Sequence, residues 1–304
     1  MSMPNTIKNL ARVMMTAKFS YRPFSKLKSK NSWNPNAQDW MTTANKMGWS
    51  QPPSTPADYA FLSAIINNAN ARVLYVAAGQ GCMIFRIFAF SDTPPIVHTV
   101  ELHQKHLDDI TQTLAENMPE DKCRNFIPQQ GNIHETEFPP QFFEYICERN
   151  LLHFSTGAQI GALYKKYFTW LTPRGKLFSS GNSPFTKLNK ETGILASIEE
   201  NEKQGKPFPG EINNFGELVT LHNPEVGKRL PALMNFLTPP ILKPVAKKAG
   251  FTEFHGGFSP LPFFKNPNNP SAEAAAALVR LDPQDQDHGK EFYWTTQTKP
   301  PQLR

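Results

Sequence analysis

The sequence predicts an α/β fold with a doubly wound, mostly parallel sheet, and three observations support this prediction. From residue 71 onward, short runs rich in β-branched and aromatic residues alternate with longer amphipathic segments. A loop with two glycines, residues 77–81, directly follows the first of these runs. The chain has 304 residues, of which 39% are hydrophobic, so it can bury the core that such a sheet requires.

The first expected helix begins near residue 55 and precedes the first strand. Thr55 can cap the helix, Pro56 suits its first position, and the charge of Asp58 favours its amino-terminal end. The five strands expected after it cover residues 72–77, 96–100, 125–129, 143–147 and 176–180. The helices expected between these strands cover residues 82–90, 103–118 and 157–170.

This alternation of strands and helices predicts a parallel sheet with helices on both faces. In such sheets, ligands bind at the carboxyl ends of the strands. The residues that follow each strand are therefore the candidates for a functional site.

Positive charge is concentrated at the amino terminus. The formal net charge is +6, from 32 basic and 26 acidic residues. Residues 1–38 contain seven basic residues and no acidic residue, which leaves 25 basic against 26 acidic residues for the rest of the chain. The body thus lacks the basic excess of a nucleic-acid-binding domain, and we expect no nucleic-acid partner. The arm is expected to form a lid. The alternatives are that it contacts a membrane or an acidic partner, or that it directs the chain to an organelle or out of the cell.

The cysteine count and the hydropathy pattern exclude other classes of protein. Cys82, Cys123 and Cys147 are dispersed without metal-ligand spacing, so we expect reduced thiols, no metal site and a cytoplasmic location. No run of about 18 uncharged apolar residues occurs, so we expect no integral membrane segment.

The loops after the first two strands favour a nucleotide-like ligand. Gly79 and Gly81 let the backbone approach a ligand closely, although a purely structural turn would also use them. Glu101 lies 20 residues beyond Gly81, at the end of the second strand, where a carboxylate can accept both hydroxyl groups of a ribose. A helix-capping role for Glu101 is the alternative. A dinucleotide site prefers a third glycine where Ile84 stands, so an NAD-dependent oxidoreductase is a weaker interpretation.

Over residues 57–281, the order of segments resembles the class I S-adenosylmethionine-dependent methyltransferases. The segments that carry the resemblance are VLYVAAGQG (73–81), VHTVE (97–101), QGNI (130–133), FFEYI (142–146), NLLHF (150–154), LTPRGKLF (171–178), and TPPIL with AGF (238–242 and 249–251). The resemblance implies a Rossmann-like, seven-stranded sheet with an antiparallel last strand. It also implies that S-adenosyl-L-methionine is the cofactor and that the methyl group moves by direct in-line transfer.

The resemblance also implies which residues bind the cofactor. The residues that stand at the family's binding positions are Tyr75, Ala77, Gly79, Gly81, Glu101, Leu102, Asn132, Ile133, Arg149 and Asn150. Among them, Glu101 would hold the ribose and Asn132 would lie beside the adenine. Tyr75 replaces an acidic residue that is usual in the first motif. This replacement keeps open a non-catalytic, cofactor-binding or regulatory protein with the same fold.

Methyl transfer from a sulfonium requires alignment of the acceptor more than covalent help from the protein. His153, just beyond the fourth strand, is the candidate general base for an acceptor that must lose a proton. A histidine that only packs against the loop would occupy the same position.

The predicted organisation has three parts. Residues 1–56 form the basic arm and lid, residues 57–281 the methyltransferase domain, and residues 282–304 a tail. Residues 182–236 are too long for a simple connection and are expected to form a Phe-lined cap over the site. The final antiparallel strand pair is expected within residues 252–281, with residues 274–281 as its second strand. We expect a small or amphipathic substrate, with a protein substrate as the alternative; the sequence leaves the oligomeric state open.

Overall fold

The computed structural model describes residues 41–42, 49–50, 53–66, 68, 70–228, 230–260 and 280–302. Nearly all of the predicted basic arm lies outside these residues, so its role as a lid stays a prediction. Its described part contains a two-stranded sheet of β1 (Met41–Thr42) and β2 (Trp49–Ser50).

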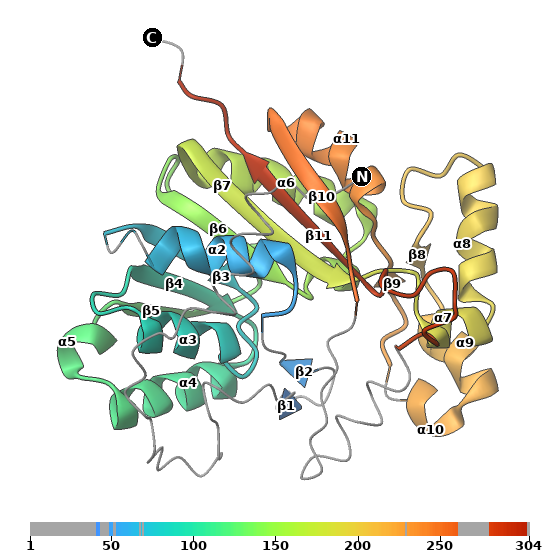
Figure 1. Cartoon of the computed structure of the whole chain (residues 1–304), viewed down its shortest axis with the longest axis horizontal. Helices are drawn as coiled ribbons and strands as arrows, with labels where there is room; N and C mark the ends of the chain where they lie inside the picture. The colour runs from blue at the N-terminus through green and yellow to red at the C-terminus, as the bar shows by residue number, and fades with distance from the viewer. Residues whose placement is uncertain are drawn as a thin grey trace.

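A seven-stranded sheet organises the chain, in the order β10-β11-β7-β6-β3-β4-β5 (Figure 1). Its strands are β3 (Arg72–Val76), β4 (Ile96–Glu101), β5 (Phe126–Gln130), β6 (Phe143–Arg149), β7 (Leu171–Asn182), β10 (Glu253–Ser259) and β11 (Phe292–Thr298). The pairs that link β5, β4, β3, β6 and β7 are parallel, and β11 runs antiparallel to both of its neighbours. The predicted fold class, a mostly parallel sheet with an antiparallel last strand, is confirmed.

Helices cover both faces of this sheet. The helices that pack on it are α2 (Pro56–Ile66), α3 (Cys82–Phe90), α4 (Gln104–Asn117), α6 (Gly157–Trp170) and α11 (Pro239–Ala249). Side chains of α2, α3 and α4 form one buried hydrophobic cluster with the sheet, and side chains of α6 and α11 form a second. A four-residue helix, α5 (Glu120–Cys123), and a 3-10 turn, η1 (Leu152–Phe154), lie in the connections.

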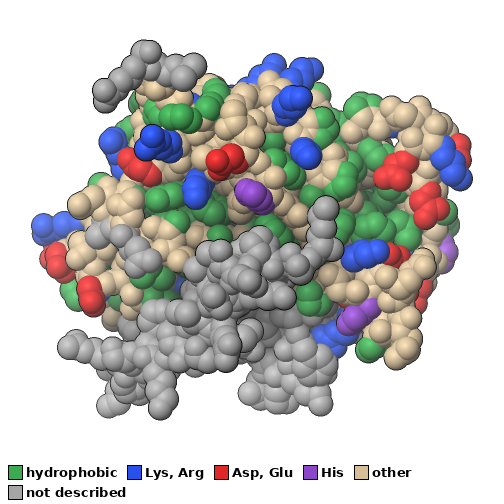
Figure 2. Space-filling view, turned by 45° about the horizontal axis from the view of Figure 1, so that its top comes forward, with side chains coloured by type: hydrophobic (Ala, Val, Ile, Leu, Met, Phe, Trp, Pro, Cys, Tyr) green, Lys and Arg blue, Asp and Glu red, His purple; other side chains and the backbone are tan. Residues whose placement is uncertain are grey.

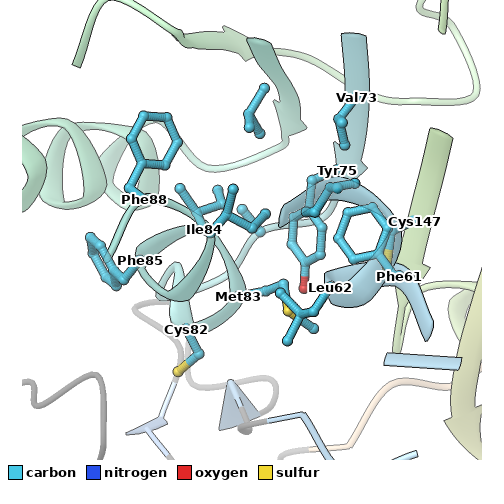
Figure 3. Packing of buried hydrophobic residues seen from close by; sticks show 14 of the residues in the cluster. Phe61, Leu62, Val73, Tyr75, Cys82, Met83, Ile84, Phe85, Phe88 and Cys147 are labelled. Carbon is cyan, nitrogen blue, oxygen red and sulfur yellow. The ribbon is translucent and has the colours of Figure 1, made fainter. Parts of the chain in front are cut away.

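The central strand β3 shows how the sequence builds both clusters. Successive side chains of a strand point to opposite faces. Val73 and Tyr75 therefore enter the cluster with α2 and α3, whereas Leu74 and Val76 enter the cluster with α6. Figure 3 shows the Tyr75 ring between α3 and the ring of Phe61 on α2, whose centroid lies 6.3 Å away.

Most predicted elements agree with the structure to within one or two residues. Helix α6 begins at Gly157, as predicted, and has a capping box: the Thr156 side chain accepts from the Gln159 N–H and the Gln159 side chain accepts from the Thr156 N–H. Strand β7 is longer than the predicted residues 176–180, since it begins directly after α6 and includes the Pro173-Arg174-Gly175 segment.

The prediction for the last strand pair was wrong. The partner of β10 is β11, not residues 274–281, of which 274–279 lie outside the described residues. Strand β11 lies between β7 and β10, so residues 292–298 of the predicted tail 282–304 belong to the sheet. Aromatic and β-branched residues, which suit a strand buried on both faces, fill this segment (FYWTTQT). The sequence-based prediction instead placed the second strand in residues 274–281, an alanine-rich apolar run that precedes this segment.

The insertion after β7 folds around its own hydrophobic cluster. Its elements are α7 (Lys187–Glu191), α8 (Ile194–Lys203), β8 (Glu211–Ile212), α9 (Phe215–His222), α10 (Pro224–Gly227) and β9 (Met234–Asn235). Ile194, Ile198, Phe215, Val219 and Phe236 are buried against one another there. Figure 1 shows these elements beyond the carboxyl end of β7, and β9 lies against η1.

Membrane-spanning helices and metal-binding clusters are both lacking in the described part of the chain. No helix there combines the length and the apolar character that crossing a bilayer requires. That part also contains no group of three or more His, Cys, Asp or Glu side chains arranged to hold a metal ion.

Candidate functional site

The glycine loop after β3 and the loop after β5 meet at one edge of the sheet, and each is hydrogen-bonded to the end of β4. The Ala77 N–H donates to Val100 O at 3.0 Å, which ties the glycine loop to the end of β4. The Gly131 N–H donates to Glu101 O at 3.0 Å and so ties the β5 loop to the same strand. These bonds bring three of the segments with predicted site residues to one edge.

The glycine loop has the left-handed backbone that a tight turn requires. Ala77, Gly79 and Gly81 have φ values of 55°, 53° and 78°. At Gly81, a Cβ would lie 2.7 Å from Cγ1 of Ile110, so both space and conformation require glycine there. Ala77 keeps the turn despite its Cβ, at a cost of roughly 1 kcal/mol.

Glu101 is the anchor of this loop. Its Oε2 accepts from the Gly79 N–H at 3.0 Å, and its Oε1 accepts from the His103 N–H at 3.1 Å. The same Oε1 lies 3.2 Å from Nδ1 of His106. Burial by itself raises the pKa of Glu101, but the hydrogen bonds from His106, Gly79 and His103 outweigh burial and lower it below its ordinary value. Glu101 is therefore a carboxylate at neutral pH, with its charge directed at the glycine loop.

The residues expected beside an adenine differ in how they are held. Leu102 is 60% exposed, an unusual degree for a leucine, and it directly follows Glu101. Ile133 is buried. Asn132 makes local bonds, since its Oδ1 accepts from the His134 N–H at 3.1 Å and its Nδ2 donates to Glu135 at 3.0 Å. The edge thus offers an apolar surface at Leu102 next to the carboxylate of Glu101.

A buried charged group lies at the end of β6. Nε of Arg149 is 2.9 Å from Oδ1 of Asp58 on α2, and the Tyr75 hydroxyl shares a hydrogen bond with Arg149. Asp58 also accepts from Ser180 Oγ at 3.1 Å and from the Thr55 N–H at 3.0 Å. Burial would lower the pKa of Arg149, but Asp58 and Tyr75 outweigh it and raise the pKa, so the guanidinium stays charged.

Tyr75 is only 3% exposed and faces the α2 and α3 cluster. Burial raises its pKa above the ordinary value, so the hydroxyl stays neutral. The position that resembles an acidic site in the methyltransferases thus carries a neutral group bonded to Arg149. Asn150, the next residue after Arg149, has a φ of 53° and donates its N–H to Ser180 O at 2.8 Å.

His153 lies in η1 and is 4% exposed. Burial lowers its pKa to about 4, so the imidazole is neutral at physiological pH and weakly basic. Its ring centroid is 4.1 Å from that of Phe154, and Nδ1 has no hydrogen-bond partner among the described residues. This environment makes His153 a poor proton acceptor, but the neutral ring can still donate or accept a hydrogen bond.

Sequence reasoning missed two residues at this edge. Asp58 was recognised as a residue of a helix start, but its pairing with Arg149, 91 positions away, has no local signal in the sequence. Asn235, on β9 of the insertion, donates its Nδ2 to Ser155 O at 3.1 Å. Only the position of the insertion against η1 reveals this second contact.

Comparison with known proteins identifies the fold. No family model matches the sequence, and no curated protein does. An S-adenosylmethionine-dependent methyltransferase from Mesorhizobium loti has 12% identity and a TM-score of 0.50, with 80% of this chain and 98% of that chain covered. The YcgJ protein from Bacillus subtilis has 12% identity and a TM-score of 0.50, with 81% and 99% covered. A SAM-dependent methyltransferase from Methanosarcina mazei has 11% identity and a TM-score of 0.50, with 77% and 95% covered.

Structural matches at identities this low show a common fold. They support the resemblance that the ordered sequence segments predicted. The strand order, the antiparallel β11 and the glycine loop anchored on Glu101 agree with it. This chain has the fold of the class I S-adenosylmethionine-dependent methyltransferases.

Proposed function

We propose that this chain is an S-adenosylmethionine-dependent methyltransferase that methylates a small or amphipathic molecule by direct in-line transfer. One observation carries the proposal. In a sheet with this fold, the carboxylate of Glu101 is bonded to the Gly79 N–H at 3.0 Å, so the ribose-binding acid and the glycine loop form one unit.

The residues at this edge fit the adenosine part of the cofactor. A carboxylate oxygen can accept two hydrogen bonds, and Oε2 of Glu101 accepts one from the described residues, which leaves one lone pair for a ribose hydroxyl. The exposed side chain of Leu102 gives a flat purine an apolar contact surface. The low pKa of Glu101 keeps it an acceptor at neutral pH.

When bound, the cofactor supplies an electrophilic methyl group, so the protein has to bind, orient and exclude water. Arg149 and Asp58 hold the start of α2 against the end of β6 and so fix one wall of the site. Tyr75 supports this wall from β3. His153 is buried beyond β6 and adds a neutral polar side chain there.

The insertion supports a small or amphipathic acceptor. Oε2 of Glu211 accepts from the Gly157 N–H at 2.7 Å, and the Phe208 ring packs so closely on Gly157 that a Cβ there would lie 2.1 Å from it. Both contacts attach the insertion to the start of α6, next to the candidate site. In the described part of the face shown in Figure 2, acidic and basic side chains are mixed, whereas a nucleic-acid-binding surface typically gathers basic side chains. A protein acceptor is the alternative.

Calorimetry with S-adenosylhomocysteine tests the proposal. Saturable binding is expected in the parent, and Glu101→Gln should weaken it about tenfold because the charged acceptor is lost. Glu116→Gln, on the exposed side of α4, is the matched control and should bind like the parent. Transfer is then measured by mass spectrometry, with labelled cofactor and a metabolite extract. Absence of binding up to millimolar concentration contradicts the proposal.

A second candidate function is a cofactor-binding or regulatory protein without transferase activity. The neutral, buried Tyr75 at the position of the usual acid favours it. It predicts that S-adenosylhomocysteine binds although no metabolite or protein in an extract gains a methyl group. Thermal stabilisation by NAD, without stabilisation by S-adenosylhomocysteine, would instead support an oxidoreductase.

A further inference from the structure

The two oxygens of the Glu101 carboxylate are used differently by the protein. An ionised carboxylate offers about four lone-pair positions, two on each oxygen. The His103 N–H donates to Oε1 at 3.1 Å, and Nδ1 of His106 lies 3.2 Å from the same oxygen. Oε2 accepts from the Gly79 N–H at 3.0 Å. Among the described residues, both positions on Oε1 are therefore occupied, whereas Oε2 keeps one position for a ligand.

The start of α4 brings His106 to this carboxylate. His106 is the third residue of the helix, and its backbone N–H donates to His103 O at 3.0 Å. The side chain of His106 is 2% exposed and that of Glu101 is 7% exposed. Because both groups are buried, neither can turn into water without disturbing the helix start. The contact is therefore a fixed part of the segment that joins β4 to α4.

The chemistry of the two groups sets the direction of this contact. An ionised carboxylate only accepts hydrogen bonds, so the Nδ1 of His106 carries the proton and donates to Oε1. Among the groups that lower the pKa of Glu101, His106 has the largest effect, ahead of the N–H groups of Gly79 and His103. His106 thus helps to keep Glu101 charged and also determines which of its oxygens is free.

We propose that His106 is a positioning residue for the cofactor: it holds Oε1 of Glu101, so that Oε2 alone meets the ribose and binds a single hydroxyl group. This inference rests on the proposed function and deepens it. It narrows the sequence-based expectation of two ribose hydroxyl groups on Glu101 to one. The site should consequently tolerate a cofactor analogue that lacks the other hydroxyl group.

Calorimetry with the full chain compares S-adenosylhomocysteine with its 2′-deoxy and 3′-deoxy analogues. One analogue should bind about tenfold more weakly than S-adenosylhomocysteine and the other should bind like it, because only one hydroxyl meets the carboxylate. His106→Leu, which removes the donor, should weaken S-adenosylhomocysteine about fivefold. It should leave the affinity for the weaker analogue unchanged, because that analogue lacks the hydroxyl through which His106 acts.

Two further variants separate positioning from packing. His106→Asn keeps a side-chain N–H donor and should restore the affinity for S-adenosylhomocysteine to that of the parent. Thr113→Val is the matched control, since Thr113 is a buried residue of the same helix whose Oγ1 donates to Asp109 O at 2.7 Å. This variant should bind like the parent. The comparison of the two analogues on the parent needs no variant, so it decides the one-hydroxyl claim even if His106→Leu fails to fold.

Four results would overturn the inference while the proposed function stands. They are equal binding of the two analogues to the parent, undiminished binding of S-adenosylhomocysteine to His106→Leu, equal weakening of S-adenosylhomocysteine and both analogues by this variant, and no recovery in His106→Asn. Failure of S-adenosylhomocysteine itself to bind the parent contradicts the proposed function, and the inference falls with it.

Discussion

Glu148 carries a pH dependence of stability that can be worked out from the structure. Its side chain is fully buried, and the hydroxyl of Ser179 and the N–H of Leu152 donate to it. Burial raises the pKa of Glu148 from its ordinary 4.5 to about 8, more than these hydrogen bonds lower it. The hydroxyls of Tyr164 and Tyr167 lie nearby and are also neutral. The native state therefore holds a proton that the unfolded chain releases.

The sign and size of the effect follow from this difference. The stabilisation is fully present below about pH 4.5 and is lost as the pH rises toward about 8, the folded pKa. Within this window, each pH unit costs roughly 1.4 kcal/mol. Between about pH 6 and pH 8, the parent should thus lose about 2 kcal/mol of unfolding free energy through this carboxyl group. Glu148→Gln, which cannot ionise, should lack this loss.

Urea unfolding, followed by tryptophan fluorescence across this pH range, measures the effect. The informative quantity is the difference in unfolding free energy between the parent and Glu148→Gln at each pH. Contributions from groups that titrate in both proteins cancel in this difference. His153, whose pKa is lowered to about 4, contributes with the opposite sign at more acidic pH, where stability falls as the pH drops from about 6.5. A difference that stays constant between about pH 6 and pH 8 would refute a protonated, buried Glu148.

The other predictions concern the glycine loop, the buried ion pair and the last strand. Gly79→Val should abolish binding of S-adenosylhomocysteine by calorimetry, whereas Gly205→Ala, also at positive φ but in open space, should bind normally. Asp58→Ala should lower the unfolding free energy by about 3–5 kcal/mol, because Arg149 stays buried without this carboxylate. Adding Arg149→Met to Asp58→Ala should restore part of the loss in the same urea experiment; no recovery would contradict the pairing. A chain that ends at Leu281 lacks β11 and should show no cooperative thermal transition by circular dichroism.

Local signals in the sequence predicted the parallel half of the sheet well. Residues 82–90 and 157–170 were predicted as helices and form α3 and α6 with those bounds, since capping residues and apolar spacing are short-range features. Glu101 was predicted at the end of its strand, and the structure places it there. The order of the segments was sufficient to predict the fold class.

The features that depend on long-range pairing were missed. Strand β11 pairs with β7 across more than a hundred residues, so spacing alone could not assign Phe292 or Trp294 to the sheet. For the same reason, Asp58 was assigned only a role at its helix terminus. Asn235 gives no sequence signal at all, because its significance comes from a neighbour, Ser155, that only the folded insertion supplies.

The crystal structure of the chain with S-adenosylhomocysteine tests the central claim most directly. We expect one ribose hydroxyl on Oε2 of Glu101, the purine against Leu102, and the homocysteine sulfur on the side of the site that faces His153. Nucleoside density away from this edge, or an edge closed by Tyr75 and Arg149 in crystals soaked with the ligand, would contradict it.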